Sequence, residues 1–315
     1  MKNTKKKMIK VRKGLEVKSL LEVADLNIKK TYNEKWLTKK ITHPYTQKPG
    51  LALAGYLNYL NKGSLQVFGK SELGYLHHLE PDECKKRLNN FLSFGIPGIV
   101  ISENLIPKTN IIEIANRNRI PVLISDLKSS LIISRTSNFL YRYFSKKVRI
   151  NGVLMDIMGM GVLITGESGI GKSETALELI KKGHQLISDD LIEFYLDSNE
   201  EPVGKYIDKI KKWIEVRGLG IINVVDMFGF GALLEEKKLD LVIELEKWDS
   251  KKKYDRLGEH NLYFPILGKD IQMFKLPVAV GRNLSTLIEI AVKFYISLKS
   301  GSESFMEYLS NQEEK

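Results

Sequence analysis

A complete G-x-x-x-x-G-K-S loop occupies Gly166-Glu167-Ser168-Gly169-Ile170-Gly171-Lys172-Ser173. The glycines of such a loop let backbone N–H groups converge on phosphate oxygens. Lys172 can reach the outer phosphates, and the Ser173 hydroxyl suits a magnesium ligand. The loop therefore predicts a binding site for a nucleotide.

The residues on both sides of the loop fit the structure that this motif requires. Residues 161–165 form an apolar run typical of a buried strand, and residues 174–182 place apolar side chains at helical spacing. Gly183 follows as a helix stop. Strand, loop and helix in this order predict an α/β nucleotide-binding domain, and a glycine-rich turn without a ligand is the less favoured alternative.

The chain is long enough for two domains with separate cores. It has 315 residues, of which 43% are hydrophobic, an ordinary share for a globular protein. We expect a smaller N-terminal α/β domain over residues 1–144, of unclear role, followed by a P-loop nucleotide-binding domain over residues 145–315, for which the resemblance described below implies a kinase. The linker is expected at Ser145-Lys146-Lys147.

Strand and helix patterns alternate in the first domain. Residues 97–102 and 120–125 are strand-like, and residues 109–118 between them suit a crossover helix. Residues 81–94 predict another helix, because they open with proline followed by two acids, which are favoured in a first turn. A further helical pattern covers residues 127–144. We see no catalytic constellation in this half.

The charge of the chain is concentrated at its start. The net charge is +11, from 49 basic and 38 acidic residues, and seven positive charges lie within residues 2–13. A basic tail can contact nucleic acid or an acidic protein surface. Only ten of the 49 basic residues are arginine, the better phosphate reader. We therefore favour a solvated, mobile N-terminus and expect no nucleic-acid partner.

Other features limit the location of the protein and the classes of site. No apolar stretch approaches the roughly 20 residues that cross a bilayer, and no signal-peptide core follows the basic start. We therefore expect a cytoplasmic protein without membrane contact. Cys84 is the only cysteine, and the five histidines lack zinc-binding spacing, so zinc chemistry has no support.

Acidic residues of the second domain are candidates for catalysis. Asp189-Asp190 follows an apolar run, and we expect it at the end of a strand that neighbours the loop strand. There a carboxylate can hold magnesium or accept a proton from a hydroxyl. Because successive strand side chains point to opposite faces, one of the two should face the phosphates. A helix cap or turn remains an equal alternative. Glu215 and Arg217, set in an apolar stretch, need partners.

Several separated motifs together resemble one family. The chain lacks the H-R-D and D-F-G signatures of eukaryotic-type protein kinases. Residues 166–173, Asp189-Asp190, residues 215–224 and Asp255-Arg256-Leu257-Gly258 resemble the signatures of bacterial HPr kinase/phosphorylase. The resemblance extends over nearly all of the chain, although its specific motifs lie in the second domain.

The resemblance implies a bifunctional enzyme of carbon catabolite regulation. In this family a serine of the phosphocarrier protein HPr is phosphorylated with ATP or pyrophosphate. The phosphoserine is removed by attack of inorganic phosphate, which yields pyrophosphate. Proteins of the family assemble as homohexamers through their catalytic domains, so the same assembly is expected here.

The resemblance also implies a role for each matching residue. Lys172 neutralises charge on the transferred phosphoryl group, and Ser173 and Glu215 hold Mg²⁺. Asp190, with Asp189 as its neighbour, accepts the serine proton in the forward reaction and returns it in the reverse.

Two more parts of the chain are assigned on the same ground. Arg256 lies at the active site, where it can stabilise charge in the transition state. Residues 214–223 shape the chemistry in both directions.

Two positions depart from the family pattern. The family's histidine before Gly-Val-Leu is Asn151 here, and asparagine can hydrogen-bond but cannot become cationic near neutral pH. A structural asparagine is as well supported as a catalytic one. Residues 277–283 have Ala279 and Val280 where the family has a Lys or Arg and a proline. In the family that loop is linked to dephosphorylation, so we expect the phosphorylase reaction to be weakened more than the kinase reaction.

Two other functions are compatible with the residues. A small-molecule kinase can use the same loop, and a non-catalytic nucleotide sensor would bind ATP without turnover, as Asn151 and Ala279 would allow. The favoured function is that of an HPr kinase/phosphorylase.

Overall fold

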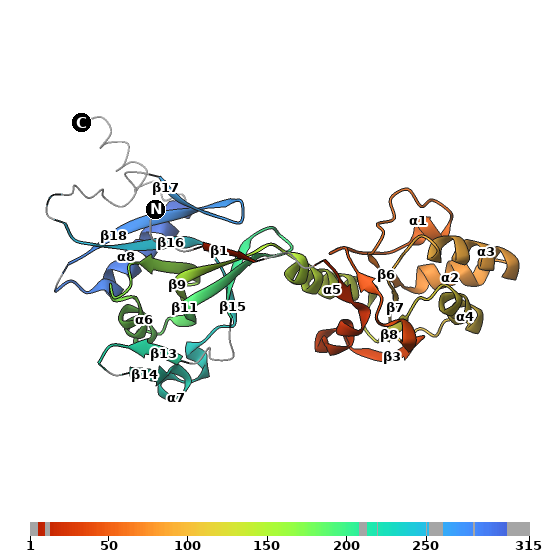
Figure 1. The fold of residues 1–315 in the computed structure, drawn as a ribbon, viewed down its shortest axis with the longest axis horizontal. Helices are drawn as coiled ribbons and strands as arrows, with labels where there is room; N and C mark the ends of the chain where they lie inside the picture. The colour runs from red at the N-terminus through yellow and green to blue at the C-terminus, as the bar shows by residue number, and fades with distance from the viewer. Residues whose placement is uncertain are drawn as a thin grey trace. The chain divides into compact units, whose positions relative to one another are not determined.

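The computed structural model describes residues 6–9, 13–207, 213–218, 220–249, 251, 261–279 and 281–300. The chain divides into two compact units, Val11–Ser145 and a second unit that combines Met1–Lys10 with Lys146–Lys315. Each unit holds its own β-sheet together with helices, so both are α/β (Figure 1). Within the described ranges, no helix has the length and apolar character needed to cross a membrane.

The unit Val11–Ser145 is built on a five-stranded sheet whose strands are parallel except at one edge. Its order is β3 (Ile28–Tyr32), β8 (Val122–Ser125), β7 (Ile99–Ile101), β6 (Leu65–Phe68) and β5 (Thr46–Gln47), with β3 antiparallel to β8. A small second sheet pairs β2 (Leu15–Glu16) with β4 (Lys40–Ile41).

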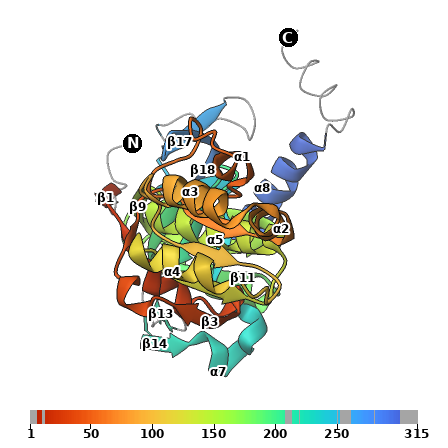
Figure 2. The same cartoon turned by 90° about the vertical axis from the view of Figure 1, so that its right-hand side faces the viewer.

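Helices cover both faces of this sheet because alternate strand residues are apolar on each side. Phe68 packs with α2 (Lys70–His78), α3 (Pro81–Leu92) and α4 (Thr109–Arg117), whereas Val67 packs with α5 (Ser129–Phe144). Helices α3 and α4 lie next to each other (Figure 1, Figure 2). The strands and helices expected between residues 81 and 144 are therefore confirmed. The remaining short helices are α1 (Gly50–Leu53), η1 (Val17–Glu22), η2 (Ala24–Leu26) and η3 (Glu34–Trp36).

The second unit has a large mixed sheet. Its order is β15 (Glu236–Lys238), β12 (Pro202–Tyr206), β11 (Gln185–Leu196), β9 (Lys147–Ile157), β10 (Met160–Gly166), β16 (Leu241–Lys247), β18 (Lys269–Val278) and β17 (Leu262–Ile266). Strands β10, β16 and β18 are parallel, so their carboxyl ends meet at one edge. Outside this sheet are the hairpin of β13 (Trp213–Val216) and β14 (Gly220–Asn223), and the helices α6 (Lys172–Lys181), α7 (Val224–Phe228), η4 (Phe230–Ala232) and α8 (Leu284–Lys299).

One segment belongs to a different unit than the sequence suggests. Strand β1 (Lys6–Ile9) pairs antiparallel with the first residues of β9, so the prediction of one domain over residues 1–144 with a mobile N-terminus is wrong for this segment. The reason is an available strand edge, because β10 pairs with Val153–Ile157 of β9 and leaves the backbone groups of Lys147–Ile150 on that side to β1.

The core beneath the nucleotide loop lies between the sheet and helices α6 and α8. Val162 and Ile164 of β10 pack there with Leu179 of α6 and Ile288 of α8, and all four side chains are fully buried. The expected strand before the loop and the expected helix after it are confirmed. This core fixes the loop at the carboxyl edge of the parallel strands.

Candidate functional site

The loop after β10 needs its glycines. Gly166, Gly169 and Gly171 have φ values of 140°, 78° and 101°, a region that favours glycine. Ile170 between them is only 7% exposed and anchors the loop in the core. Helix α6 begins at Lys172, so its first N–H groups and the positive end of its dipole face the space above the loop. The geometry suits phosphate oxygens.

Lys172 lies across the loop. Its Nζ donates hydrogen bonds to the backbone carbonyl oxygens of Gly166, at 3.0 Å, and Glu167, at 2.9 Å. Burial lowers the pKa of Lys172 below its usual value, although the charges of Asp189 and Asp190 oppose this shift. The amine is therefore held at the loop by weak acceptors that a phosphate can replace.

The strand that contains Asp189 and Asp190 differs from the prediction in two ways. It was expected to end at these residues beside the loop strand, but β11 continues to Leu196 and β9 lies between β11 and β10. The reason is local, because β9 and β10 are joined by a tight turn at Met158-Gly159 and pair as a hairpin.

Asp189 nevertheless reaches the loop. Ser173 Oγ, in the first turn of α6, donates a hydrogen bond to Asp189 Oδ1 over 3.1 Å. Gly152 of β9 pairs with Asp190 of β11, and a Cβ at Gly152 would come within 2.7 Å of the backbone oxygen of Ile164 in β10. The intervening strand β9 therefore has no side chain at this point.

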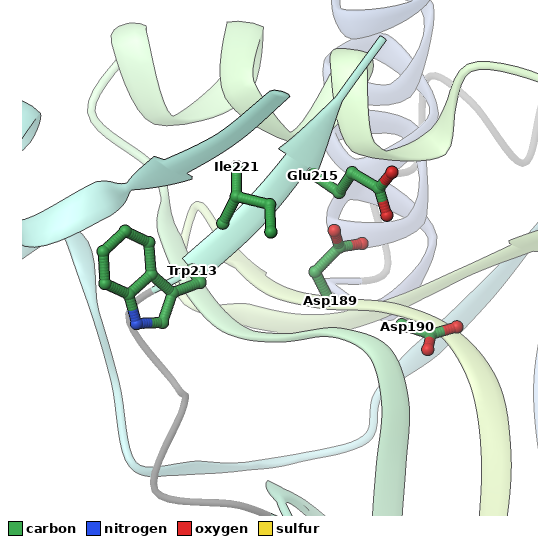
Figure 3. A pocket seen from close by; sticks show the side chains of 5 residues that line it. All are labelled: Asp189, Asp190, Trp213, Glu215 and Ile221. Carbon is green, nitrogen blue, oxygen red and sulfur yellow. The ribbon is translucent and has the colours of Figure 1, made fainter. Parts of the chain in front are cut away.

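Both aspartates line one cavity, although their side chains point in different directions (Figure 3). Asp190 has a φ of 78°, a left-handed conformation that interrupts the alternation of side chains along an extended strand. The cavity has a volume of ≈ 510 Å³ and is lined by Asp189, Asp190, Trp213, Glu215 and Ile221. Figure 3 shows the carboxylates of Asp189 and Glu215 close together and that of Asp190 directed away from them.

The two aspartates have different surroundings. Asp189 is half-buried, and burial raises its pKa to about 6, with a further contribution from the charge of Asp190. Hydrogen bonds from the Ser173 hydroxyl and from backbone N–H groups oppose the shift. Asp190 is exposed and therefore accessible to a substrate.

Asn151 contacts the exposed aspartate. It lies on β9 opposite Leu191, and its Nδ2 donates a hydrogen bond to Asp190 Oδ1 over 3.3 Å. The position at which the sequence departs from the family pattern is thus in contact with the acid expected to move a proton. The sequence placed Asn151 near the site only through the resemblance, because β9 was not expected beside β11.

Oxygen ligands suitable for a magnesium ion come together beside the loop. Asp189 and Glu215 line this side of the cavity, and Asp189 accepts a hydrogen bond from the Ser173 hydroxyl. Among the residues that the structure describes, no group of three or more His, Cys, Asp or Glu side chains could hold a metal by itself. This combination fits Mg²⁺, which usually keeps several waters and binds through one or two carboxylates and substrate phosphates.

The apolar rim of the cavity was not predicted. Trp213 of β13 is 45% exposed and Ile221 of β14 is 70% exposed. Ile214 and Val216, which alternate with Trp213 and Glu215 along β13, are buried. The signal in the sequence was the alternation along β13, which places Trp213 and Glu215 on the same face.

The loop that follows β18 also reaches the edge near the nucleotide loop. Trp248 N donates a hydrogen bond to the Val278 carbonyl oxygen at 3.0 Å, and the Arg282 guanidinium lies 5.1 Å from the Trp248 ring centroid. Asn283 caps α8 by accepting a hydrogen bond from Thr286 N. Val280 and the predicted Arg256 lie outside the described residues.

Comparisons with known proteins agree over both units. Residues 15–140 match the profile described as "HPr Serine kinase N terminus", and residues 142–312 match "HPr Serine kinase C-terminal domain". The HPr kinase/phosphorylase of Geobacillus thermodenitrificans is 38% identical over 270 residues, which are 86% of this chain and 87% of that protein.

A second relative and one solved structure are also similar to this chain, the structure over a shorter part of it. The HPr kinase/phosphorylase of Bacillus velezensis is 40% identical over 258 residues, 82% of this chain and 83% of that protein. The structure of the Hpr(Ser) kinase/phosphatase from Coxiella burnetii is 34% identical, with a TM-score of 0.45, and covers 51% of this chain and 97% of that one.

Proposed function

The chain belongs to the HPr serine kinase family, and we propose that it transfers a phosphoryl group from ATP or pyrophosphate to a serine of HPr. In the reverse direction, inorganic phosphate attacks the phosphorus of the phosphoserine, the bond to the serine oxygen breaks, and pyrophosphate is formed. The enzyme is thus a bifunctional protein-serine kinase and phosphorylase, a phosphotransferase with HPr as its protein substrate.

The observation that supports this proposal best is that two adjacent carboxylates contact different parts of the site. Asp189 accepts a hydrogen bond from the Ser173 hydroxyl of the nucleotide loop. Asp190 is exposed and accepts a hydrogen bond from Asn151. One carboxylate is thereby directed to the donor and the other to the acceptor. Phosphoryl transfer needs both functions, since charge on the donor must be neutralised and the attacking hydroxyl must lose a proton.

We assign the proton transfer to Asp190. As the serine Oγ bonds to the terminal phosphorus and the bond to the leaving phosphate breaks, the serine proton passes to the Asp190 carboxylate. In the phosphorylase direction Asp190 returns that proton to the departing serine Oγ. Asn151 orients the carboxylate in both directions through its amide.

We assign the donor phosphates to residues 166–173. Lys172 exchanges its carbonyl partners for phosphate oxygens, and Ser173 and Glu215 hold Mg²⁺, with Asp189 accepting the Ser173 hydroxyl. When bound, the metal neutralises charge on the donor phosphates. The half-buried position of Asp189 favours a cation here, because a cation restores the ionised form that burial disfavours.

An acceptor on a folded protein suits the rim of the cavity. Trp213 and Ile221 expose apolar surface beside the two aspartates, which is the kind of surface that protein interfaces bury. We place the reaction in the cytoplasm, where ATP and HPr are found together. We also propose a homohexamer, as the family resemblance implies, and light scattering of the purified protein tests it.

The proposed function is tested by incubation of the protein with ATP, Mg²⁺ and purified HPr, followed by mass analysis of HPr. We expect one phosphoserine, which disappears when inorganic phosphate is added while pyrophosphate accumulates. HPr with alanine at the modified serine serves as the control, and a panel of metabolites tests small-molecule kinase activity. Unmodified HPr after incubation with a protein that binds ATP would overturn the proposal.

A further inference from the structure

We propose that Arg217 is a further catalytic residue, whose guanidinium contacts the terminal phosphates of the bound donor and stabilises charge during transfer. This inference rests on the proposed function for its reaction. Its structural basis is the contact between the β13–β14 hairpin and the nucleotide loop.

The guanidinium lies directly against the loop. From the position where a Cβ of residue 169 would stand, Arg217 Nη2 is 2.6 Å, Cζ 3.2 Å and Nη1 3.3 Å away. The end of the side chain therefore lies against Gly169, and a Cβ at this position would have to displace the guanidinium. The φ of 78° at Gly169 separately favours glycine.

The hairpin presents Arg217 on the same strand face as Trp213 and Glu215. Along β13, Ile214 and Val216 are buried in the core, and Trp213 and Glu215 point away from it toward the cavity. Arg217 follows next in this alternation, at the turn. Glu215 therefore lies beside the aspartates while Arg217 lies beside the loop.

The charge of Arg217 has no anionic partner within the parts of the chain that the structure describes. The loop it lies against also carries the Lys172 ammonium and leads into the positive end of α6, and the loop's own acid, Glu167, pairs with Lys247 at 3.0 Å. Positive groups on and beside one loop favour a bound anion. A polyphosphate is a ligand of this kind.

The chemistry of an arginine suits this place. A guanidinium keeps its charge at all relevant pH values and offers planar, paired donors that match phosphate oxygens. In phosphoryl transfer, negative charge shifts among the oxygens around the transferred phosphorus, and an arginine supplied from the same chain stabilises it. The benefit appears mainly in the rate and less in the affinity for the ground state.

The test compares Arg217→Gln with the unmodified protein in two measurements. The first is kcat for HPr phosphorylation with ATP and Mg²⁺, for which we expect a loss of about 10³-fold in the variant. The second is the affinity for ADP with Mg²⁺, measured by calorimetry with and without aluminium fluoride, which mimics the transferring group. The unmodified protein should bind ADP more tightly when fluoride is present, and the variant should lose this gain while its affinity for ADP alone changes by less than about tenfold.

Lys181→Gln is the matched control, because it removes one positive charge from the exposed far end of α6 and should leave both measurements unchanged. Arg217→Lys guards against a folding defect, since it keeps the charge and should recover part of the lost rate. A kcat of Arg217→Gln within about threefold of the unmodified value, or an undiminished gain with fluoride, would overturn the inference. If the unmodified protein does not phosphorylate HPr, the proposed function fails, whereas the fluoride measurement still decides the role of Arg217.

Discussion

Asn151 donates a hydrogen bond from its amide to the Asp190 carboxylate over 3.3 Å, so the residue that replaces the family's histidine contacts the acid assigned to proton transfer. An amide can orient a carboxylate, but it cannot bring a positive charge to an incoming phosphate. Together with Ala279, this arrangement predicts that the phosphorylase reaction is weaker than the kinase reaction.

We expect Asn151→His and Ala279→Lys to raise the ratio of phosphorylase to kinase rates, because each restores a cation where phosphate must enter as an anion. Both rates are measured on one preparation of each protein, with HPr and phosphoserine-HPr as substrates. A single cation near a phosphate contributes about 1.5–3 kcal/mol, so a rise of roughly tenfold or more is expected. An unimpaired phosphate-dependent reaction in the unmodified protein would contradict this prediction.

Asp190→Asn should abolish most of the transfer without loss of the fold. Asparagine tolerates the left-handed backbone at this position but cannot accept the serine proton. We expect kcat to fall by about 10²–10⁴-fold, while ADP binding stays close to that of the unmodified protein. Calorimetry and the HPr assay measure the two quantities, and a variant that retains half of the rate would exclude Asp190 as the base.

The local elements could be predicted from the sequence because their signals are local. The loop, its strand and its helix follow from glycines and apolar spacing, and the φ values of Gly166 and Gly171 agree with that interpretation. Helix α8 (Leu284–Lys299) carries a signal of the same local kind, an apolar stripe that the structure buries against the sheet.

The relation between β11 and the loop could not be predicted, because it depends on pairings across the chain. The hairpin of β9 and β10 places Asn151 between Asp190 and the loop strand, and alternation along β11 fails where Asp190 takes a left-handed conformation. The contact between Arg217 and Gly169 likewise joins two segments whose spacing in the sequence gives no hint of it.

The stability of the protein should depend on pH through Asp189. Its pKa is raised from 3.8 to about 6 in the folded state, so between these values the folded protein binds more protons than the unfolded chain. The free energy of unfolding therefore falls as pH rises through this window, by at most about 3 kcal/mol, since each pKa unit is worth about 1.4 kcal/mol. Below pH 3.8 Asp189 does not lower the free energy of unfolding, and above pH 6 the whole decrease is present.

Asp189→Asn removes this ionisation while keeping an acceptor for the Ser173 hydroxyl. The quantity to compare is the free energy of unfolding of the variant minus that of the unmodified protein, in buffer without Mg²⁺. We expect this difference to be about 1–3 kcal/mol larger at pH 8 than at pH 4. Urea unfolding at both pH values measures it, and Glu178→Gln, an exposed acid on α6, is the control. An equal difference at the two pH values would show that Asp189 does not titrate as described.

Lys172→Met tests whether the loop holds the donor as proposed. Among the described contacts, the ammonium is hydrogen-bonded only to loop carbonyls. Its removal should therefore change the stability of the fold little and lower the affinity for the nucleotide strongly. The loss of one charge-assisted contact corresponds to about 1.5–3 kcal/mol, or roughly a 10- to 150-fold weaker affinity for ATP, and kcat should fall further because charge on the phosphates grows during transfer. Calorimetry with ATP, the HPr assay and a thermal melt of the same preparation separate these effects. Full-speed phosphorylation of HPr by Lys172→Met would contradict the assignment, because no other amine of α6 lies at the loop within the described residues.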